Sequence, residues 1–233
     1  EVLGLLASQR SCFIDPVDYL GSVFKCPEFC PVLLWGCSHG DLHGRNILVS
    51  ILDDDVNLPA LFDYEEMGLD NAVGWDFVKL ETEIKVRALP SMFAGREPEF
   101  FEKVLQFERH LADCTQMIHD QDDQRPVYDA PVEAQRLAVV ILTIRKQARR
   151  HLGLQHQRDR QWLEEYYVLL ACYGVRCACY PTYQGIRRQI AAAYISAGVA
   201  ARHLSRPWRQ LEAKIREAKL LAKRVCQQLK HGD

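Results

Sequence analysis

One stretch limits what this chain can fold into more than any other, the run His-Gly-Asp-Leu-His-Gly-Arg-Asn-Ile-Leu-Val at residues 39–49. It places Asp41 five positions before Asn46, and Asn46 directly precedes a branched apolar run. A second apolar run ends at Asp63. Four intervening residues let the chain turn back between the acid and the amide, and the glycines of the stretch allow the backbone angles of such a loop. We therefore expect both side chains to point into one cleft.

The two apolar runs, residues 47–52 and 59–62, are separated by Asp and Asn residues that favour a turn, so we predict a β-hairpin. Antiparallel pairing places the start of one strand beside the end of the next. Asn46 and Asp63 should therefore converge on one point. Upstream, residues 32–35 lead into the motif as a brief strand or turn.

These residue types suit metal-assisted phosphoryl transfer. Mg²⁺ prefers hard oxygen ligands, and transfer to a hydroxyl needs a carboxylate that accepts its proton. Asp41 is the candidate base, and Asn46 and Asp63 are the candidate metal ligands. The alternative, that these are ordinary turn residues, is weakened by their joint occurrence. His43 and Arg45 fit either phosphate or substrate contacts, or packing and pairing with nearby acids.

The pattern His-Gly-Asp-x4-Asn, followed by a strand and Asp, resembles the aminoglycoside phosphotransferase and choline kinase-like branch of the protein-kinase fold. The resemblance implies that Asp41 is the catalytic base and that Asn46 and Asp63 bind Mg²⁺. It also implies that His39 is a scaffolding residue of the catalytic loop and that Asp76 braces this loop. The implied cofactors are Mg²⁺ and ATP or another nucleoside triphosphate, and the implied substrate is an unknown hydroxyl acceptor.

The string at residues 39–49 and the run Trp-Asp-Phe-Val-Lys-Leu-Glu at residues 75–81 are also similar to a kinase-like domain of bacterial conflict systems, the ternary-complex-associated domain. The specific likeness covers residues 33–90. The protein-kinase fold normally has an upstream N-lobe whose lysine contacts the nucleotide, and only 38 residues precede His39. We expect a C-lobe cut from a longer protein and inactive alone for lack of an N-lobe. The alternative is a pseudokinase or scaffold that binds a protein partner through its basic helical half.

After the hairpin the apolar period becomes helical. We expect an α+β fold, mostly α, that forms one domain over residues 1–233: a lead-in segment (1–32), the catalytic loop with its metal-binding hairpin (33–76) and a helical subdomain (77–233). Pro90 should stop the first helix, and the alanines at 193, 197 and 201 suggest close helix packing. The predicted helices are 75–89, 97–117, 132–151, 159–180, 183–204 and 207–230, with a surface loop at 118–131.

Charge is divided unevenly along the chain. Residues 1–129 hold 24 acids and 10 Lys or Arg, whereas residues 130–233 hold 7 acids and 19 Lys or Arg. Such a difference steers a polyanion to the second half or lets the halves attract each other. The basic amphipathic segment 207–230 is either a solvated face or a docking surface for an acidic protein, an anionic lipid or, less favoured, nucleic acid.

Nine cysteines, an odd number, without a secretory segment at the start favour a reducing compartment, and we expect a cytoplasmic protein. Cys26, Cys30, Cys37 and His39 could be drawn as a metal cluster, but no second ligand pair of zinc-site spacing accompanies them, so buried thiols are the preferred interpretation. The longest apolar run, residues 166–173, is far shorter than the roughly 20 residues that a bilayer requires, so no membrane span is expected.

Overall fold

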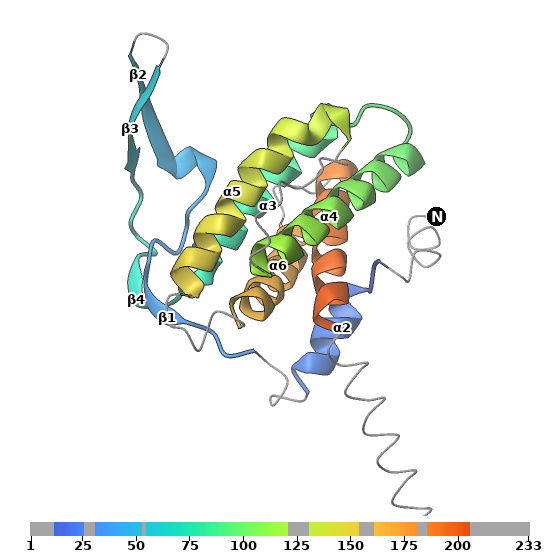
Figure 1. Ribbon diagram of the computed structural model, residues 1–233, viewed down its shortest axis with the longest axis horizontal. Coiled ribbons are helices and arrows are strands. Elements are labelled where there is room, and N and C mark those ends of the chain that lie inside the picture. Colours follow the sequence, from blue (N-terminus) through green and yellow to red (C-terminus); the bar gives the residue numbers. More distant parts are fainter. Residues whose placement is uncertain are drawn as a thin grey trace, which may run out of the picture.

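The computed structural model describes residues 12–25, 31–52, 55–120, 131–153, 161–180 and 186–205. Its elements, in chain order, are α2 (Pro16–Val23), β1 (Trp35–Ser38), the 3-10 turn η2 (Gly44–Asn46), β2 (Ile47–Leu52), β3 (Asp55–Leu61), β4 (Gly68–Ala72), α3 (Gly74–Met92), α4 (Glu97–His119), η3 (Val132–Ala134), α5 (Gln135–Leu152), α6 (Trp162–Ala178) and a helix at 187–205. The prediction of a mostly helical α+β fold is confirmed (Figure 1).

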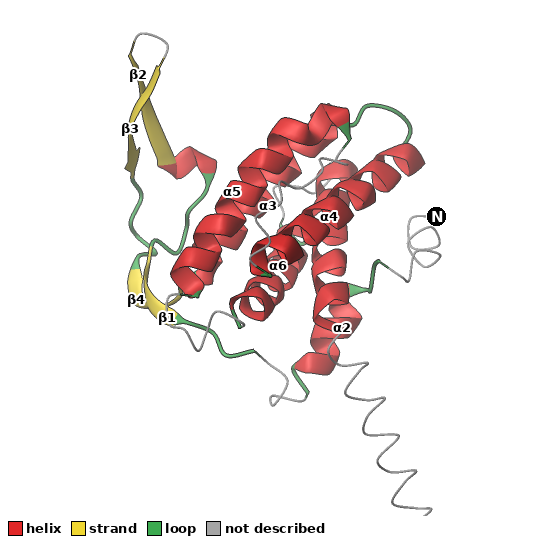
Figure 2. Ribbon diagram, viewed as in Figure 1, coloured by secondary structure: helices red, strands yellow, loops and turns green. Residues whose placement is uncertain are grey.

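Two small antiparallel sheets carry the predicted site. β2 pairs with β3, with Ile47 opposite Leu61, which confirms the hairpin. β1 pairs with β4, with Trp35 opposite Ala72. The hairpin reaches away from the helices, whereas β1 and β4 lie close to them (Figure 2). The sequence did not predict β4, because Gly-Leu-Asp-Asn-Ala has weak strand propensity and becomes a strand only by pairing with β1.

Two local predictions placed the limits of an element at the wrong residues. The helix predicted to stop at Pro90 continues to Met92, because Leu89 and Phe93, on either side of the proline, are fully buried and hold the last turn against the core. Ahead of the catalytic loop, β1 begins only at Trp35. The backbone N–H of Leu34 donates to the Glu165 carboxylate on α6 at 2.7 Å, and its carbonyl accepts the N–H of Val73, directly after β4, at 2.9 Å.

α4 extends through residues 118 and 119, the first two of the predicted surface loop 118–131, and residues 121–130 of that loop lie outside the described residues. Asp15 caps α2 by accepting from the backbone N–H of Val17, which fits short helical turns in the lead-in. The basic segment 207–230, together with Cys26 and Cys30, lies outside the described residues. Among the described helices, none has the length and apolarity that a membrane crossing requires.

α3 is the central helix and packs against both α5 and α6. The helix at 187–205 approaches α6 where the chain has small residues on both sides. A Cβ atom at Gly174 would lie 2.9 Å from the Ala197 Cβ and 2.9 Å from the Ala193 carbonyl oxygen. The close packing predicted from the alanine spacing is therefore confirmed at these positions.

The helical core also contains a buried ion network. Glu81 on α3 accepts two hydrogen bonds from the Arg145 guanidinium on α5, at 2.6 and 2.9 Å, and one from the Lys85 ammonium at 2.8 Å. Lys85 also lies 2.8 Å from the Glu108 carboxylate on α4. Tyr166 on α6 donates its hydroxyl to Glu81 at 2.6 Å. The network joins four helices with two acids and two cations, and each of the four charged groups is at most 2% exposed.

Candidate active site

The predicted catalytic loop is held to α3 by Asp76. The Asp76 carboxylate accepts the backbone N–H of His39 at 2.7 Å and that of Leu42 at 3.3 Å, so it joins the two ends of the turn that contains Asp41. Asp76 and His39 are both buried. Because these are backbone contacts, the Asp76 carboxylate positions the main chain of the loop whatever side chains the loop carries at these two residues.

The His39 ring joins the catalytic loop to the segment after the hairpin. Its Nδ1 accepts the backbone N–H of Asp41 at 3.3 Å, and its Nε2 lies 2.9 Å from the Phe62 carbonyl oxygen. Since Nδ1 accepts and Nε2 donates, the neutral tautomer with the proton on Nε2 satisfies both contacts. His39 therefore sets the distance between Asp41 and Asp63, the residue that follows Phe62.

Asp41 is surrounded by three polar side chains. Its Oδ1 forms an ion pair with the Lys79 ammonium on α3. Its Oδ2 accepts from the Asn46 amide at 3.3 Å and lies 3.5 Å from His43 Nε2. The Asn46 amide nitrogen also donates to the Asp41 backbone carbonyl at 3.0 Å. Asp41 and Asn46 are thus brought together, as the spacing predicted.

The lysine was not predicted from the sequence. Lys79 is buried, and burial lowers the pKa of its ammonium, as does the positive charge of Arg176, while Glu83 opposes this effect. A signal was present in the sequence, because Lys79 lies three positions after Asp76 on the same face of α3. Asp76 therefore holds the backbone of the loop, and Lys79 contacts the carboxylate that the loop carries.

His43 and Arg45 occupy the outer part of the loop. His43 Nδ1 accepts the backbone N–H of Arg45 at 3.2 Å and so caps the 3-10 turn η2. Burial and the nearby Arg45 charge lower the pKa of His43, which favours the neutral ring at pH 7. Arg45 is exposed. Both residues, with Asp41, Lys79 and others, line a small cavity of about 190 Å³.

Asn46 and Asp63 lie at the base of the hairpin. The backbone carbonyl of Asn46 accepts the N–H of Phe62 at 3.2 Å, which places Asn46 beside the residue that precedes Asp63. Asn46 is buried, whereas Asp63 is exposed and has a φ of 63°. Within the described part of the chain, the Asn46 amide oxygen has no hydrogen-bond donor. The carboxylate and this amide oxygen are the hard donors that suit Mg²⁺.

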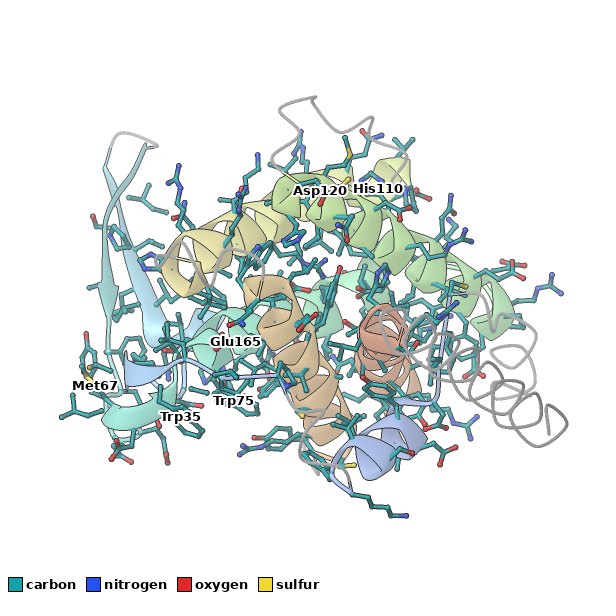
Figure 3. All side chains as sticks on the ribbon, turned by 60° about the horizontal axis from the view of Figure 1, so that its bottom comes forward. Trp35, Met67, Trp75, His110, Asp120 and Glu165 are labelled. Atoms are coloured by element: carbon teal, nitrogen blue, oxygen red, sulfur yellow. The ribbon has the colours of Figure 1, made fainter. Side chains whose placement is uncertain are left out.

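A larger cavity of about 660 Å³ lies beside the loop, and Asp41 and Asp63 both line it. Figure 3 shows where β1, α3 and α6 meet beside this cavity, with Trp35 on β1, Trp75 on α3 and Glu165 on α6. The charged side chains of the lining are divided by sign. The acids, all from the loop and the segment after the hairpin, are Asp41, Asp63, Glu65 and Glu66. The cations, both from helices, are Lys79 and Arg176.

Gly40 gives the loop a conformation that other residues adopt at a cost. Its φ is 79°, and a Cβ atom would lie 2.4 Å from the Glu66 carbonyl oxygen. We expect Gly40→Ala to lower the free energy of unfolding by about 1 to 3 kcal/mol in urea denaturation. Gly44→Ala is the control in the same loop, because a Cβ atom at Gly44 would meet no other atom within 4 Å. Equal stability of the two variants would contradict the prediction.

Of the four residues that could be drawn as a metal cluster, Cys26 and Cys30 lie outside the described residues. Within the described part of the chain, no group of three or more His, Cys, Asp or Glu side chains is arranged to hold a metal ion. Cys37 is exposed, not buried as expected, because it lies on the short ribbon of β1 and β4 at the surface. Cys12, Cys114 and Cys177 do fit the expectation of buried thiols.

Comparison with known proteins identifies the family of the chain. No curated protein matches it, and no solved structure does. The model of one family, described as ternary complex associated domain 9, matches residues 13–177. This range is more than half of the chain and contains the catalytic loop, the hairpin, Asp76 and Lys79. The chain therefore belongs to the ternary complex associated domain 9 family.

Proposed function

We propose that the cleft beside the catalytic loop transfers a phosphoryl group from ATP, or another nucleoside triphosphate, to the hydroxyl of an acceptor. The observation that carries this proposal is the arrangement of three residues. Asp41 accepts from Asn46, and Asp41 and Asp63 line one cavity. A carboxylate base, an amide oxygen and a second carboxylate are the group types that metal-assisted phosphoryl transfer requires.

Each residue has a distinct task in this proposal. Asp41 accepts the proton of the acceptor hydroxyl, and the contact with Asn46 holds its Oδ2 in place. Asn46 directs its amide nitrogen to Asp41, so its oxygen is left for a metal ion. Asp63 supplies a second oxygen. Mg²⁺ bound by these residues would neutralise the charge of the nucleotide phosphates during transfer.

Lys79 has a part in the same chemistry. The ion pair with Oδ1 fixes the orientation of the Asp41 carboxylate, which leaves Oδ2 as the oxygen that faces Asn46 and His43. Neutral His43 can donate from Nε2 to the same oxygen without adding positive charge. Asp41 is therefore held on three sides, which favours a fixed geometry for the proton acceptor.

Asp41→Asn in the full-length gene product is the test. An amide cannot accept the hydroxyl proton. We therefore expect the rate at which labelled γ-phosphate is transferred from ATP to acceptors in a cell extract to fall by about 10² to 10⁴-fold. Binding of ATP with Mg²⁺, measured by calorimetry, should stay close to the wild-type value. Asp70→Asn on β4 is the control, because Asp70 is exposed and lines neither cavity. Equal transfer by wild type and Asp41→Asn would refute the proposal.

A second candidate function is a scaffold that binds a protein partner. The hairpin favours it, because Leu48, Val49 and Ile51 are 50 to 70% exposed on strands that have no third neighbour among the described residues. A two-stranded hairpin with apolar side chains in water is a typical contact surface. The family description, which refers to a ternary complex, also suggests protein partners. This candidate predicts that Asp41→Asn leaves partner binding and biological activity unchanged.

A further inference from the structure

We propose that the acceptor bound in the larger cavity is a small hydroxyl compound that also carries an oxyanion, a phosphate or a carboxylate, and that Arg176 binds this group. The proposal rests on the proposed phosphoryl transfer and adds the chemical class of the substrate. Arg176 lies in the last turn of α6 and lines the same cavity as Asp41.

Aromatic rings position the Arg176 guanidinium. Its central carbon lies 5.8 Å from the centre of the Trp75 ring and 5.8 Å from that of the Tyr180 ring. A guanidinium that stacks on aromatic rings keeps the N–H groups at its edge available to bind an oxyanion with two hydrogen bonds. Within the described residues, the Arg176 side chain has neither a carboxylate partner nor a hydrogen bond. The rings therefore orient the Arg176 guanidinium, while no carboxylate among the described residues neutralises its positive charge.

Lys79 adds a second positive charge to the same wall. Arg176 is near enough to contribute to the lowered pKa of Lys79, so the two cations repel each other. Lys79 is already paired with Asp41, whereas Arg176 has no such partner within the described part of the chain. An oxyanion at Arg176 would relieve this repulsion, and it would lie on the helical side of the cavity, away from the acids after the hairpin.

The size of the cavity fits a small molecule. About 660 Å³ is within the usual range for small-ligand sites. Asp41 and Arg176 line one continuous space, so a single compound can present a hydroxyl to the first and an oxyanion to the second. The four acids of the lining would repel the oxyanion elsewhere, which gives the acceptor one orientation.

Glycerol 3-phosphate and glycerol make a matched pair of probes, because they differ only in the phosphate. Both are titrated by calorimetry into the full chain at low ionic strength with Mg²⁺ and without nucleotide. We expect glycerol 3-phosphate to bind and Arg176→Gln to weaken it by about tenfold or more, the effect of losing a charge-assisted contact. Arg176→Lys, which keeps the charge, should give an intermediate affinity. Arg136→Gln on α5 is the control, since Arg136 is exposed and lines neither cavity.

The outcomes separate this inference from the proposed function, because no phosphoryl transfer is measured. Undetectable binding of glycerol 3-phosphate to the wild type at millimolar concentration would overturn the inference, as would equal affinity of the wild type and Arg176→Gln. Binding of glycerol as strongly as its phosphate would also overturn it. Calorimetric titration of ATP with Mg²⁺ tests the nucleotide as the other source of a phosphate group. If Arg176→Gln weakened the binding of ATP alone and not that of glycerol 3-phosphate, Arg176 would be assigned to the nucleotide and an acceptor site would be refuted.

Discussion

Glu81→Gln is expected to lower the free energy of unfolding by about 3 to 5 kcal/mol, the usual cost of breaking a buried ion pair from one side. The Glu81 carboxylate accepts from Arg145, Lys85 and Tyr166, and it is fully buried. Glutamine is similar in size but uncharged, so the Arg145 guanidinium would remain buried without its counterion. Urea denaturation measures the effect. The control is Glu102→Gln, an exposed position on α4 where stability should not change.

The dependence of stability on acid pH measures the contribution of Glu81 in a second way. Burial alone would raise the pKa of Glu81, but the charges of Arg145 and Lys85 outweigh burial and lower the pKa to about 2 from an ordinary value of 4.5. The unfolded chain therefore binds the proton first as pH falls. Glu81 contributes about 3 kcal/mol of stability above pH 4.5, and this contribution is lost between about pH 4.5 and pH 2. Glu81→Gln should lack this part of the acid dependence, and an unchanged acid profile would contradict the assignment.

Local patterns in the sequence predicted the hairpin and the pair of Asp41 and Asn46. Turn residues between two apolar runs specify a hairpin directly, and a fixed spacing of five positions limits how far Asp41 and Asn46 can separate. The same local logic failed at Pro90, where burial of the flanking residues in the tertiary core outweighed the cost of a proline inside α3.

Partners that are distant in sequence were not predictable in this way. Arg176 lies more than a hundred positions after Asp41, and no spacing rule connects them. The ion network on α3 was missed for a related reason. Glu81 and Lys85 are charged residues in a predicted helix, and such residues normally face water. Only the arrangement of α3 against α5 and α6 shows that Arg145, the partner of Glu81, is buried with them.

The family match and the motif support different statements. The match assigns the chain to the ternary complex associated domain 9 family over residues 13–177. The resemblance to a kinase C-lobe rests on the sequence motif. Asp76 is thus the residue on which the proposed catalytic geometry depends most, because it fixes the loop without contacting the cavity.

Asp76→Ala is expected to release the catalytic loop from α3. The backbone N–H groups of His39 and Leu42 would lose their acceptor, and the first of these contacts is buried. Loss of two charge-assisted hydrogen bonds should lower the free energy of unfolding by about 2 to 4 kcal/mol in urea denaturation. Amide hydrogen exchange provides the local readout, since the His39 and Leu42 amides should lose protection while those of α5 keep it.

Asp76→Asn is the matched variant that separates loop release from loss of packing. Asparagine has the shape of aspartate but only one acceptor oxygen, so it can keep the contact with either His39 or Leu42 and not both. Its stability and exchange protection should therefore lie between those of the wild type and Asp76→Ala. Since Asp76 lines neither cavity, release of the loop should reduce phosphoryl transfer through the position of Asp41 and not through a lost ligand contact. Retained His39 protection in Asp76→Ala would refute the role of this carboxylate.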